Sequence, residues 1–169
     1  MSNYGIVGNG YYHYESLNDN VKVIYNLNKN VNERYLIMNL FKAGSNNPID
    51  ISIVLNITGS SIESFGKGIR LSYYNKIEIL EYEGEVEDGM DNRYILLTDA
   101  FNREINYYYD SSYVSNTHKR FLSYSESNYI LISNDNENNI EIVDKDKNKF
   151  IYDLTLSNCY PRYIRKYNN

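Results

Sequence analysis

The chain has 169 residues, including 20 tyrosines and one cysteine, and it carries a formal net charge of -5 at pH 7. This acidic balance argues against a nucleic-acid binder, which normally shows a basic surface, and gives no support for binding to an anionic membrane. The single cysteine, Cys159, excludes an internal disulfide and any zinc site built from several thiolates.

The residue composition predicts an all-β protein. Tyrosine and the β-branched residues favour half-buried pleated surfaces, and the many asparagines favour turns. An AT-rich genome would enrich the same residues whatever the fold, but it would not produce the alternation of apolar and polar residues along the chain. We expect antiparallel hairpins and meanders in a curved sheet or sandwich, with little helix. We expect one domain over residues 1–169, with a Gly/Tyr-rich segment at 1–20 and a last edge strand or loose tail at 156–169.

The N-terminal segment carries Gly5, Gly8 and Gly10, followed by a tyrosine-rich run at 11–14. These glycines lack the preceding strand and the following helix that a dinucleotide-binding loop needs, so we expect no nucleotide cofactor there. The segment has neither a basic start nor a long apolar run, so we expect no signal peptide. No segment has the roughly 20 apolar residues that a membrane span requires. We therefore expect a soluble protein, either cytoplasmic or exported by a route without a signal peptide.

The first strands are predicted at 21–25, at 35–41 and at 49–57. The stretch 35–41 is a more continuous apolar run, whereas apolar and polar residues alternate with period two along 49–57. Along 49–57 one face holds only aliphatic residues, and we expect this face to lie on the core. Its members are Ile49, Ile51, Ile53, Leu55 and Ile57.

The stretch from Ser64 to Ile79 combines a turn with a strand. We expect Gly66 and Gly68 to stand where the backbone turns sharply or lies close against another strand, because they have no side chain. The residues after them alternate as in one half-buried strand. Its inward face would hold Ile69, Leu71, Tyr73, Ile77 and Ile79.

The second half of the chain alternates short strands with polar turns. The acidic stretch 81–91 lacks the ligand spacing of an EF-hand, so a solvated loop is preferred over a calcium site. We expect a short helical turn near 116–122. The strands form a hairpin and then a three-strand meander. They cover 94–98, 104–109, 129–132, 140–143 and 150–154.

Residues that could carry chemistry are few and scattered. His13 and His118 are the only histidines, and no serine stands in a nucleophile elbow. Asp144, Asp146 and Asn148 begin like a calcium loop, but its glycine and its final glutamate are missing, so we interpret them as a charged hairpin turn. We expect no catalytic residue, no cofactor and no metal ion.

Clustered tyrosines are the candidates for contacts with a partner. A strand divides neighbouring tyrosines between its two faces, so where one face is core the other is exposed or covered. Exposed tyrosines suit protein contacts and the stacking of sugars. Packing between two sheet layers is the alternative role. The candidates for partner binding are Tyr11, Tyr12, Tyr14, Tyr74 and Tyr108.

Three motifs, the last of them present twice, resemble one protein family in the same order along the chain. Ser64–Tyr73, with the sequence SFGKGIRLSY, resembles the FGKGW-R-L-y-Y segment that opens the β-shell of rearrangement-hotspot (Rhs, or YD-repeat) proteins. Pro48–Asn56 is similar to the strand that lies just upstream of that segment. Thr98–Asp110 resembles the T-D-x-x-G-x-x-x-x-Y-x-Y-D repeat, and Ile142–Asp153 is a shorter relative. The resemblance covers about residues 20 to 155.

The chain departs from the family pattern at three positions. Ile69 stands where tryptophan is usual, and Asn102 and Asn148 stand where the repeat glycines are usual. Asparagine tolerates the left-handed backbone angle that glycine would supply, so we expect both turns to form.

The resemblance implies a non-enzymatic structural or assembly protein. In the family, the repeats wind into a β-shell that encloses a toxin or forms part of a toxin complex. A chain of this length would not close such a shell alone, so the resemblance implies a cap, an initial segment or a self-assembling fragment. The proteolytic motif of the family has no counterpart here. A binding module for a protein or glycan, adhesin-like or immunity-like, is the alternative, and a hydrolase is a third hypothesis.

Overall fold

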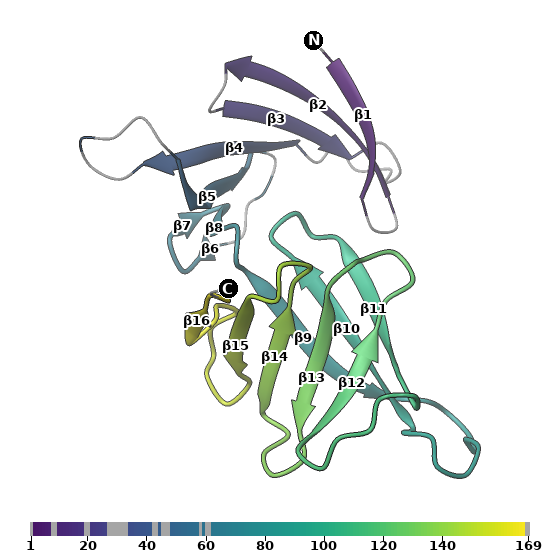
Figure 1. The fold of residues 1–169 in the computed structure, drawn as a ribbon. Helices are drawn as coiled ribbons and strands as arrows, with labels where there is room; N and C mark the ends of the chain where they lie inside the picture. The colour runs from purple at the N-terminus through teal and green to yellow at the C-terminus, as the bar shows by residue number, and fades with distance from the viewer. Residues whose placement is uncertain are drawn as a thin grey trace. The chain divides into compact units, whose positions relative to one another are not determined.

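A computed structural model of the chain describes residues 2–7, 10–18, 21–26, 34–41, 44, 48–57, 59 and 62–167. These residues form strands and turns, with no helix among them, so the predicted all-β class is confirmed (Figure 1). Within this part of the chain, no helix is available to cross a membrane.

The chain divides into two compact units. The first comprises Met1–Tyr74 with Asp99–Arg103, and the second comprises Asn75–Thr98 with Glu104–Asn169. The turn Asp99–Arg103 is thus counted with the first unit, although the strands on both sides of it belong to the second. Compactness does not test whether the two units unfold together, so the expectation of one domain stays a prediction.

The first unit is built on a six-stranded sheet with the strand order β1-β2-β3-β4-β5-β8. Each strand pairs antiparallel with its neighbours, and β6 and β7 form a separate two-stranded hairpin. The strands predicted at 21–25, 35–41 and 49–57 are present as β3, β4 and β5. The bounds are β1 Ser2–Val7, β2 Gly10–Asn18, β3 Val21–Asn26, β4 Arg34–Phe41, β5 Pro48–Asn56, β6 Ile62–Glu63, β7 Gly66–Lys67 and β8 Ile69–Leu71.

The described core of the first unit is small. Tyr35, Val54 and Ala100 are fully buried. Tyr74 and Phe101 pack against them, and the rings of Tyr35 and Phe101 meet edge to face with their centroids 5.6 Å apart. An edge-to-face pair of this kind adds to the stabilisation that burial alone supplies.

The fully buried residue of β5 lies on the face opposite to the predicted one. Val54 is buried, whereas Ile53 and Leu55 are half-buried and Ile57 is 53% exposed. The pairing of β4 with β5 places Val54 on the same face of the sheet as Tyr35, which is the large buried side chain of this unit. Alternation in a sequence shows which residues share a face, but it does not show which face the rest of the protein covers.

Gly68 stands where the backbone turns and closely approaches another strand, as predicted. Its φ of +70° lies in the left-handed region, and its carbonyl accepts a hydrogen bond from the backbone N of Asn56 at 2.8 Å. A Cβ at this position would lie 2.7 Å from the Asn56 carbonyl oxygen. Glycine is therefore required at position 68 both by the backbone angle and by the space available.

Replacing Gly68 by alanine should lower the free energy of unfolding by about 2 to 3 kcal/mol, because the methyl group meets backbone and the residue must stay left-handed. Gly44→Ala is the matched control: its φ is +74°, but a Cβ there has no atom within 4 Å. The control should lose only about 1 kcal/mol. Urea unfolding followed by tyrosine fluorescence measures both losses. Equal losses of stability in the two variants would show that the close approach of Gly68 to the Asn56 carbonyl oxygen is unimportant.

The prediction of one strand over 69–79 is wrong. β8 ends at Leu71, a turn is closed by a hydrogen bond of 3.0 Å from Tyr74 N to Leu71 O, and β9 begins at Asn75. The two strands belong to different units. Because Ile77 continues the odd-numbered alternation of the residues in β8, the sequence pattern carries no sign of the break.

The second unit is an eight-stranded antiparallel sheet that curls around its own core (Figure 1). The strand order runs from β16 to β9, so every strand pairs with its neighbour in the sequence. The bounds are β9 Asn75–Glu81, β10 Arg93–Asp99, β11 Glu104–Tyr109, β12 His118–Leu122, β13 Tyr129–Ser133, β14 Asn139–Val143, β15 Lys149–Asp153 and β16 Tyr163–Arg165. The buried core is formed by Ile77, Ile95, Leu97, Ile105, Tyr107, Phe121, Ile130, Ile132, Ile140, Ile142 and Tyr152.

Most elements predicted for this half of the chain are confirmed. The hairpin is present as β10 and β11, and the meander as β13, β14 and β15. The helical turn expected near 116–122 is wrong, because His118–Leu122 forms β12, in which Phe121 is fully buried opposite Ile130. Of the two alternatives for the tail, the edge strand is present as β16, which pairs with β15.

Candidate functional site

Four tyrosines form a row across the second unit, called the tyrosine row below. Tyr82, Tyr94, Tyr108 and Tyr124 are neighbours in this order, with ring centroids 5.0, 6.4 and 5.5 Å apart. Tyr82 follows β9, Tyr94 lies on β10, Tyr108 lies on β11, and Tyr124 follows β12. Tyr94 and Tyr108 are directly paired across the strands, and they alternate with the buried core residues beside them. The row therefore lies on the face of the sheet opposite the core.

The tyrosine row is open to solvent at both ends, since Tyr124 is 96% exposed and Tyr82 is 39% exposed. The pKa of Tyr82 is raised, first because burial disfavours the phenolate and then because of its neighbours Tyr108 and Tyr94. The rings of Tyr94 and Tyr108 are stacked, and those of Tyr82 and Tyr124 are tilted against them. The row therefore offers hydroxyls, ring edges and the exposed ring of Tyr124. Such a surface can form both hydrogen bonds and apolar contacts with a protein or a sugar.

Two predicted candidates for partner binding are described with their side chains. Tyr108 is a central member of the tyrosine row. Tyr74 is half-buried in the first unit, where the guanidinium of Arg70 lies 3.9 Å from its ring centroid. Arg70 also donates to Glu63 at 2.9 Å and to Asn102 Oδ1 at 2.7 Å. Tyr74 thus takes part in the packing of its own unit, and a role in partner binding stays a prediction.

The other three candidates, Tyr11, Tyr12 and Tyr14, lie on β2. Their backbones pair with Ile6, Gly5 and Asn3 of β1 in that order. Their side chains lie outside the described residues, so the binding role expected for them stays a prediction.

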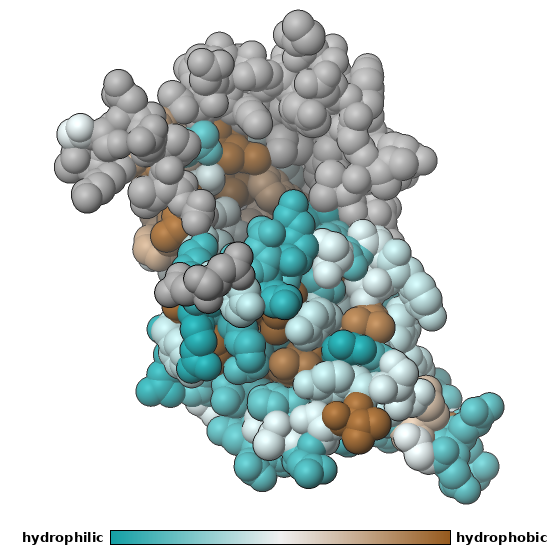
Figure 2. Space-filling model, viewed as in Figure 1, coloured by the Kyte–Doolittle hydropathy of each residue, from teal (hydrophilic) through white to brown (hydrophobic). Residues whose placement is uncertain are grey.

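The acidic stretch forms the loop between β9 and β10, called the acidic arm below. All residues from 82 to 90 are exposed, as predicted for a solvated loop. The arm extends from the sheet at the lower right of Figure 1, and it is largely hydrophilic in Figure 2. The rest of the visible face of the second unit is also mostly hydrophilic, with apolar residues in small separate patches (Figure 2).

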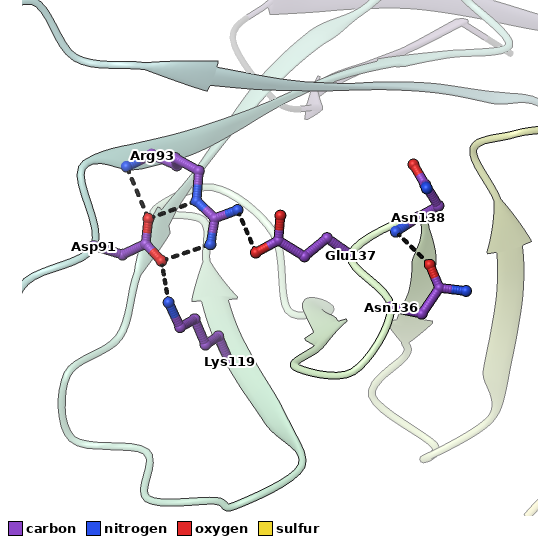
Figure 3. A network of polar contacts seen from close by, with 6 residues as sticks. All are labelled: Asp91, Arg93, Lys119, Asn136, Glu137 and Asn138. Carbon is purple, nitrogen blue, oxygen red and sulfur yellow. Dashed lines mark hydrogen bonds and ion pairs between the residues drawn. The ribbon is translucent and has the colours of Figure 1, made fainter.

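The base of the acidic arm is held by an ion-pair network (Figure 3). The Asp91 carboxylate accepts hydrogen bonds from Arg93 Nε at 2.8 Å and from Lys119 Nζ at 2.7 Å, and the Asp91 side chain is only 3% exposed. Arg93 also pairs with Glu137 at 2.9 Å. The hydrogen bond from Arg93 is the main cause that holds the pKa of Asp91 well below its usual range, while burial alone would raise it. The network ties the arm to β12 and to the loop between β13 and β14.

The turn between β10 and β11 is organised by the carboxylate of Asp99. Oδ1 accepts hydrogen bonds from the backbone N of Phe101 at 2.9 Å and of Arg103 at 3.0 Å, and Oδ2 accepts one from Arg103 Nε at 2.6 Å. The backbone adds two bonds of 3.0 Å, from Asp99 N to Arg103 O and from Asn102 N to Asp99 O. Asn102 has a φ of +57°, which confirms the left-handed conformation expected for it.

The turn between β14 and β15 repeats this pattern. Asp144 Oδ1 accepts hydrogen bonds of 2.9 Å from the backbone N of Asp146 and of Asn148, and Oδ2 accepts one of 3.0 Å from Asn148 Nδ2. Backbone bonds of 3.0 Å again run from Asp144 N to Asn148 O and from Lys147 N to Asp144 O. The left-handed residue is Lys147, with a φ of +63°, so the left-handed conformation expected for Asn148 is wrong. We call these two structures the aspartate turns.

A second aspartate recurs after each of the two hairpins. Asp110 follows β11, and Asp153 is the last residue of β15. Oδ1 of each accepts hydrogen bonds from the backbone N, at 3.0 Å, and from the hydroxyl, at 2.6 Å, of the residue two positions further on, Ser112 or Thr155. An arginine lies against Oδ2 in both cases. The two hairpins therefore share their side-chain chemistry as well as their turn geometry.

The residues that could carry chemistry have different neighbours in the described part of the chain. His118 Nδ1 lies 2.8 Å from Thr117 Oγ1, and the side chain of His13 is outside the described residues. Cys159 is half-buried and lines a cavity of about 240 Å³ together with residues of β9 and β15. Among the described residues, no group of three His, Cys, Asp or Glu is arranged to hold a metal ion. The expectation that the protein is not an enzyme stays a prediction.

Comparison of the chain with protein-family models, with curated proteins and with solved structures gives no match. The resemblance to rearrangement-hotspot proteins therefore stays a prediction.

Proposed function

We propose that the chain is a non-enzymatic structural and assembly protein, a segment of a β-shell of the kind found in rearrangement-hotspot proteins and associated with a toxin or surface complex. The observation that carries the proposal is the repetition of the aspartate turn. The same five-residue pattern of hydrogen bonds closes the β10–β11 and β14–β15 hairpins, and the same aspartate contact follows each hairpin.

Repetition of this kind favours an architectural role. In a repeat protein each unit contacts mainly its neighbours, so a sheet can be extended by adding further hairpins of the same kind. Both oxygens of Asp99 and of Asp144 accept hydrogen bonds that close their own turns. Of the residues before the second aspartates, Tyr152 belongs to the core of the curled sheet and Tyr109 packs against it. The repeated residues thus serve the framework of the sheet.

The proposal predicts that the protein associates with itself, because a sheet of this kind leaves strand edges that another copy can cover. Sedimentation equilibrium over a hundredfold range of concentration measures the mass in solution. We expect masses above the 19.9 kDa of a single chain, increasing with concentration. A mass that stays at 19.9 kDa over the whole range would contradict the proposal.

The tyrosine row favours a second candidate function, a module that binds a protein or a glycan. A glycan array with the purified protein tests this function, with Tyr124→Ala as the variant that removes the 96% exposed ring of the row. Tyr163→Ala is the matched control, since Tyr163 is 48% exposed and lies on β16, outside the row. Binding that is lost in the first variant and kept in the second would support this function. Binding that is equal in both would place the ligand elsewhere.

A further inference from the structure

The curled sheet of the second unit has two edge strands, β9 and β16, and each has a neighbouring strand on one side only in the described chain. Tyr82 N donates to Asn92 O on the β10 side at 2.8 Å, and Asn75 N donates to Cys159 O at 2.8 Å. Backbone groups of successive residues in a strand point to opposite sides. Tyr82 bonds toward β10, whereas Asn75, seven residues earlier, bonds to Cys159 on the other side of β9. Ile77, Ile79 and Glu81 consequently direct their N–H and C=O groups away from β10.

The two edges carry opposite charges. β9 contains Lys76, Glu78 and Glu81, so its net charge is negative although Lys76 pairs with Glu78 at 3.6 Å, and it leads directly into the acidic arm. β16 and the residue after it carry Arg165 and Lys166, both of which are exposed. Opposite charges at two edges attract each other when the edges belong to different molecules, and like charges keep identical edges apart.

The two edges also match in the placement of their apolar residues. On β9, Ile77 belongs to the core and Ile79 packs against it. On β16, Ile164 lies opposite Phe150, which packs against the same core. The apolar side chains of both edges therefore lie on the inner face of the sheet, and a pairing of β16 with β9 would keep that face continuous.

We propose that the β16 edge of one copy pairs with the β9 edge of a second copy, so that the sheet continues from molecule to molecule in a head-to-tail manner. This inference rests on the proposed assembly function and names its contact surface. Because the two paired surfaces differ, the association leaves one free edge of each kind and can continue into open chains. It does not require the tyrosine row, which lies on the other face of the sheet.

A different explanation of the same charges leads to the opposite result. Short, basic edge strands are also a means by which proteins prevent unwanted pairing. If Arg165 and Lys166 serve that purpose, their replacement should increase association. If they attract the β9 edge of another copy, reversal of their charge should weaken association.

A charge-swap experiment with the full chain tests the proposal. One variant carries Arg165→Glu with Lys166→Glu, and the other carries Glu78→Lys with Glu81→Lys. In each variant alone the two edges have charge of the same sign, so the dissociation constant for self-association should rise about tenfold or more. An equimolar mixture should associate as the wild type does, because every edge then meets one of opposite charge. Circular dichroism of each variant verifies that the sheet is folded.

The control is Lys67→Glu with Lys145→Glu, which changes the net charge by the same amount as the β16 variant but at exposed positions outside both edge strands. This control should associate as the wild type does. A wild type that associates while the swaps have no effect, or a mixture that is not restored, overturns this inference and leaves the assembly function intact. A wild type that stays monomeric overturns both.

Discussion

Replacing Asp91 by asparagine should lower the free energy of unfolding of the second unit by about 3 kcal/mol at pH 7. The Asp91 side chain is 3% exposed, and it is the shared partner of Arg93 and Lys119 at the base of the acidic arm (Figure 3). The variant keeps the shape of the side chain but leaves the guanidinium of Arg93, which is only 14% exposed, without its main counter-charge. Breaking a buried ion pair from one side costs more than the pair contributes, because a charge remains in a poorly solvated place.

Asp88→Asn is the matched control, because Asp88 is an exposed carboxylate of the same arm. It should change the stability by less than about 0.5 kcal/mol. Urea unfolding followed by circular dichroism measures both variants. Equal stabilities of the two variants would show that the Asp91 network contributes nothing to the fold.

The effect of Asp91→Asn should depend on pH. The pKa of Asp91 in the folded protein is lowered, first by the hydrogen bond from Arg93 and with a further contribution from Lys119, against the opposing effect of burial. A carboxylate with a lowered pKa stabilises the fold fully above its pKa in the unfolded chain, about 3.9, and this contribution is lost as the pH falls through the folded pKa. The difference between wild type and variant should therefore be the same at pH 7 and pH 5.5 and decrease below about pH 4.

Removal of the carboxylate from the two aspartate turns should have unequal effects. Asp99→Ala should lower the free energy of unfolding by about 3 kcal/mol, since Asp99 is 9% exposed and accepts three hydrogen bonds from Phe101 and Arg103. Asp144→Ala removes the same set of bonds, but the residues in the middle of that turn are exposed, so water can replace the lost acceptor. Asp144→Ala should therefore lower the free energy of unfolding by only about 1 kcal/mol.

Asp99→Asn separates the two contributions of the Asp99 carboxylate. The amide oxygen can still accept from the backbone N groups of Phe101 and Arg103, whereas the ion pair with Arg103 Nε is lost. The free energy of unfolding of Asp99→Asn should therefore lie between that of the wild type and that of Asp99→Ala. Thermal unfolding of the four proteins in one buffer gives the order. An Asp144→Ala loss as large as that of Asp99→Ala would show that burial of the turn is unimportant.

The strands of the second unit were predictable because their pattern is local. Each hairpin of β10 with β11, and of β14 with β15, combines alternating apolar residues with a turn that begins at an aspartate. The turn chemistry depends on neighbours within five residues, so it can be read from the sequence. The exact position of the left-handed residue could not be predicted from residue type, because Lys147 rather than Asn148 adopts this conformation. The geometry of the whole turn decides which residue is left-handed, and it overrides the preference of asparagine for that conformation.

Features that depend on distant residues could not be predicted. The ion-pair network at Asp91 joins the base of the acidic arm to β10, β12 and the loop between β13 and β14, and nothing local distinguishes Asp91 from the other carboxylates of the acidic arm. The tyrosine row is visible in the sequence only as separate tyrosines, since strand register decides that Tyr94 stands opposite Tyr108. The buried face of β5 likewise depends on Tyr35, which lies on another strand. All three features, the Asp91 network, the tyrosine row and the buried face of β5, depend on contacts between residues that are distant in the sequence.

The most direct measurement of the central claim, that this sheet is built to continue into another copy, is residue-resolved hydrogen exchange of β9 at graded protein concentrations. The amides of Ile77, Ile79 and Glu81 point away from β10, and they should become protected as the concentration rises. The amides of Glu78 and Leu80 point toward β10 and should exchange slowly at every concentration. Fast exchange of the first set at concentrations where the mass already exceeds that of one chain would contradict the claim.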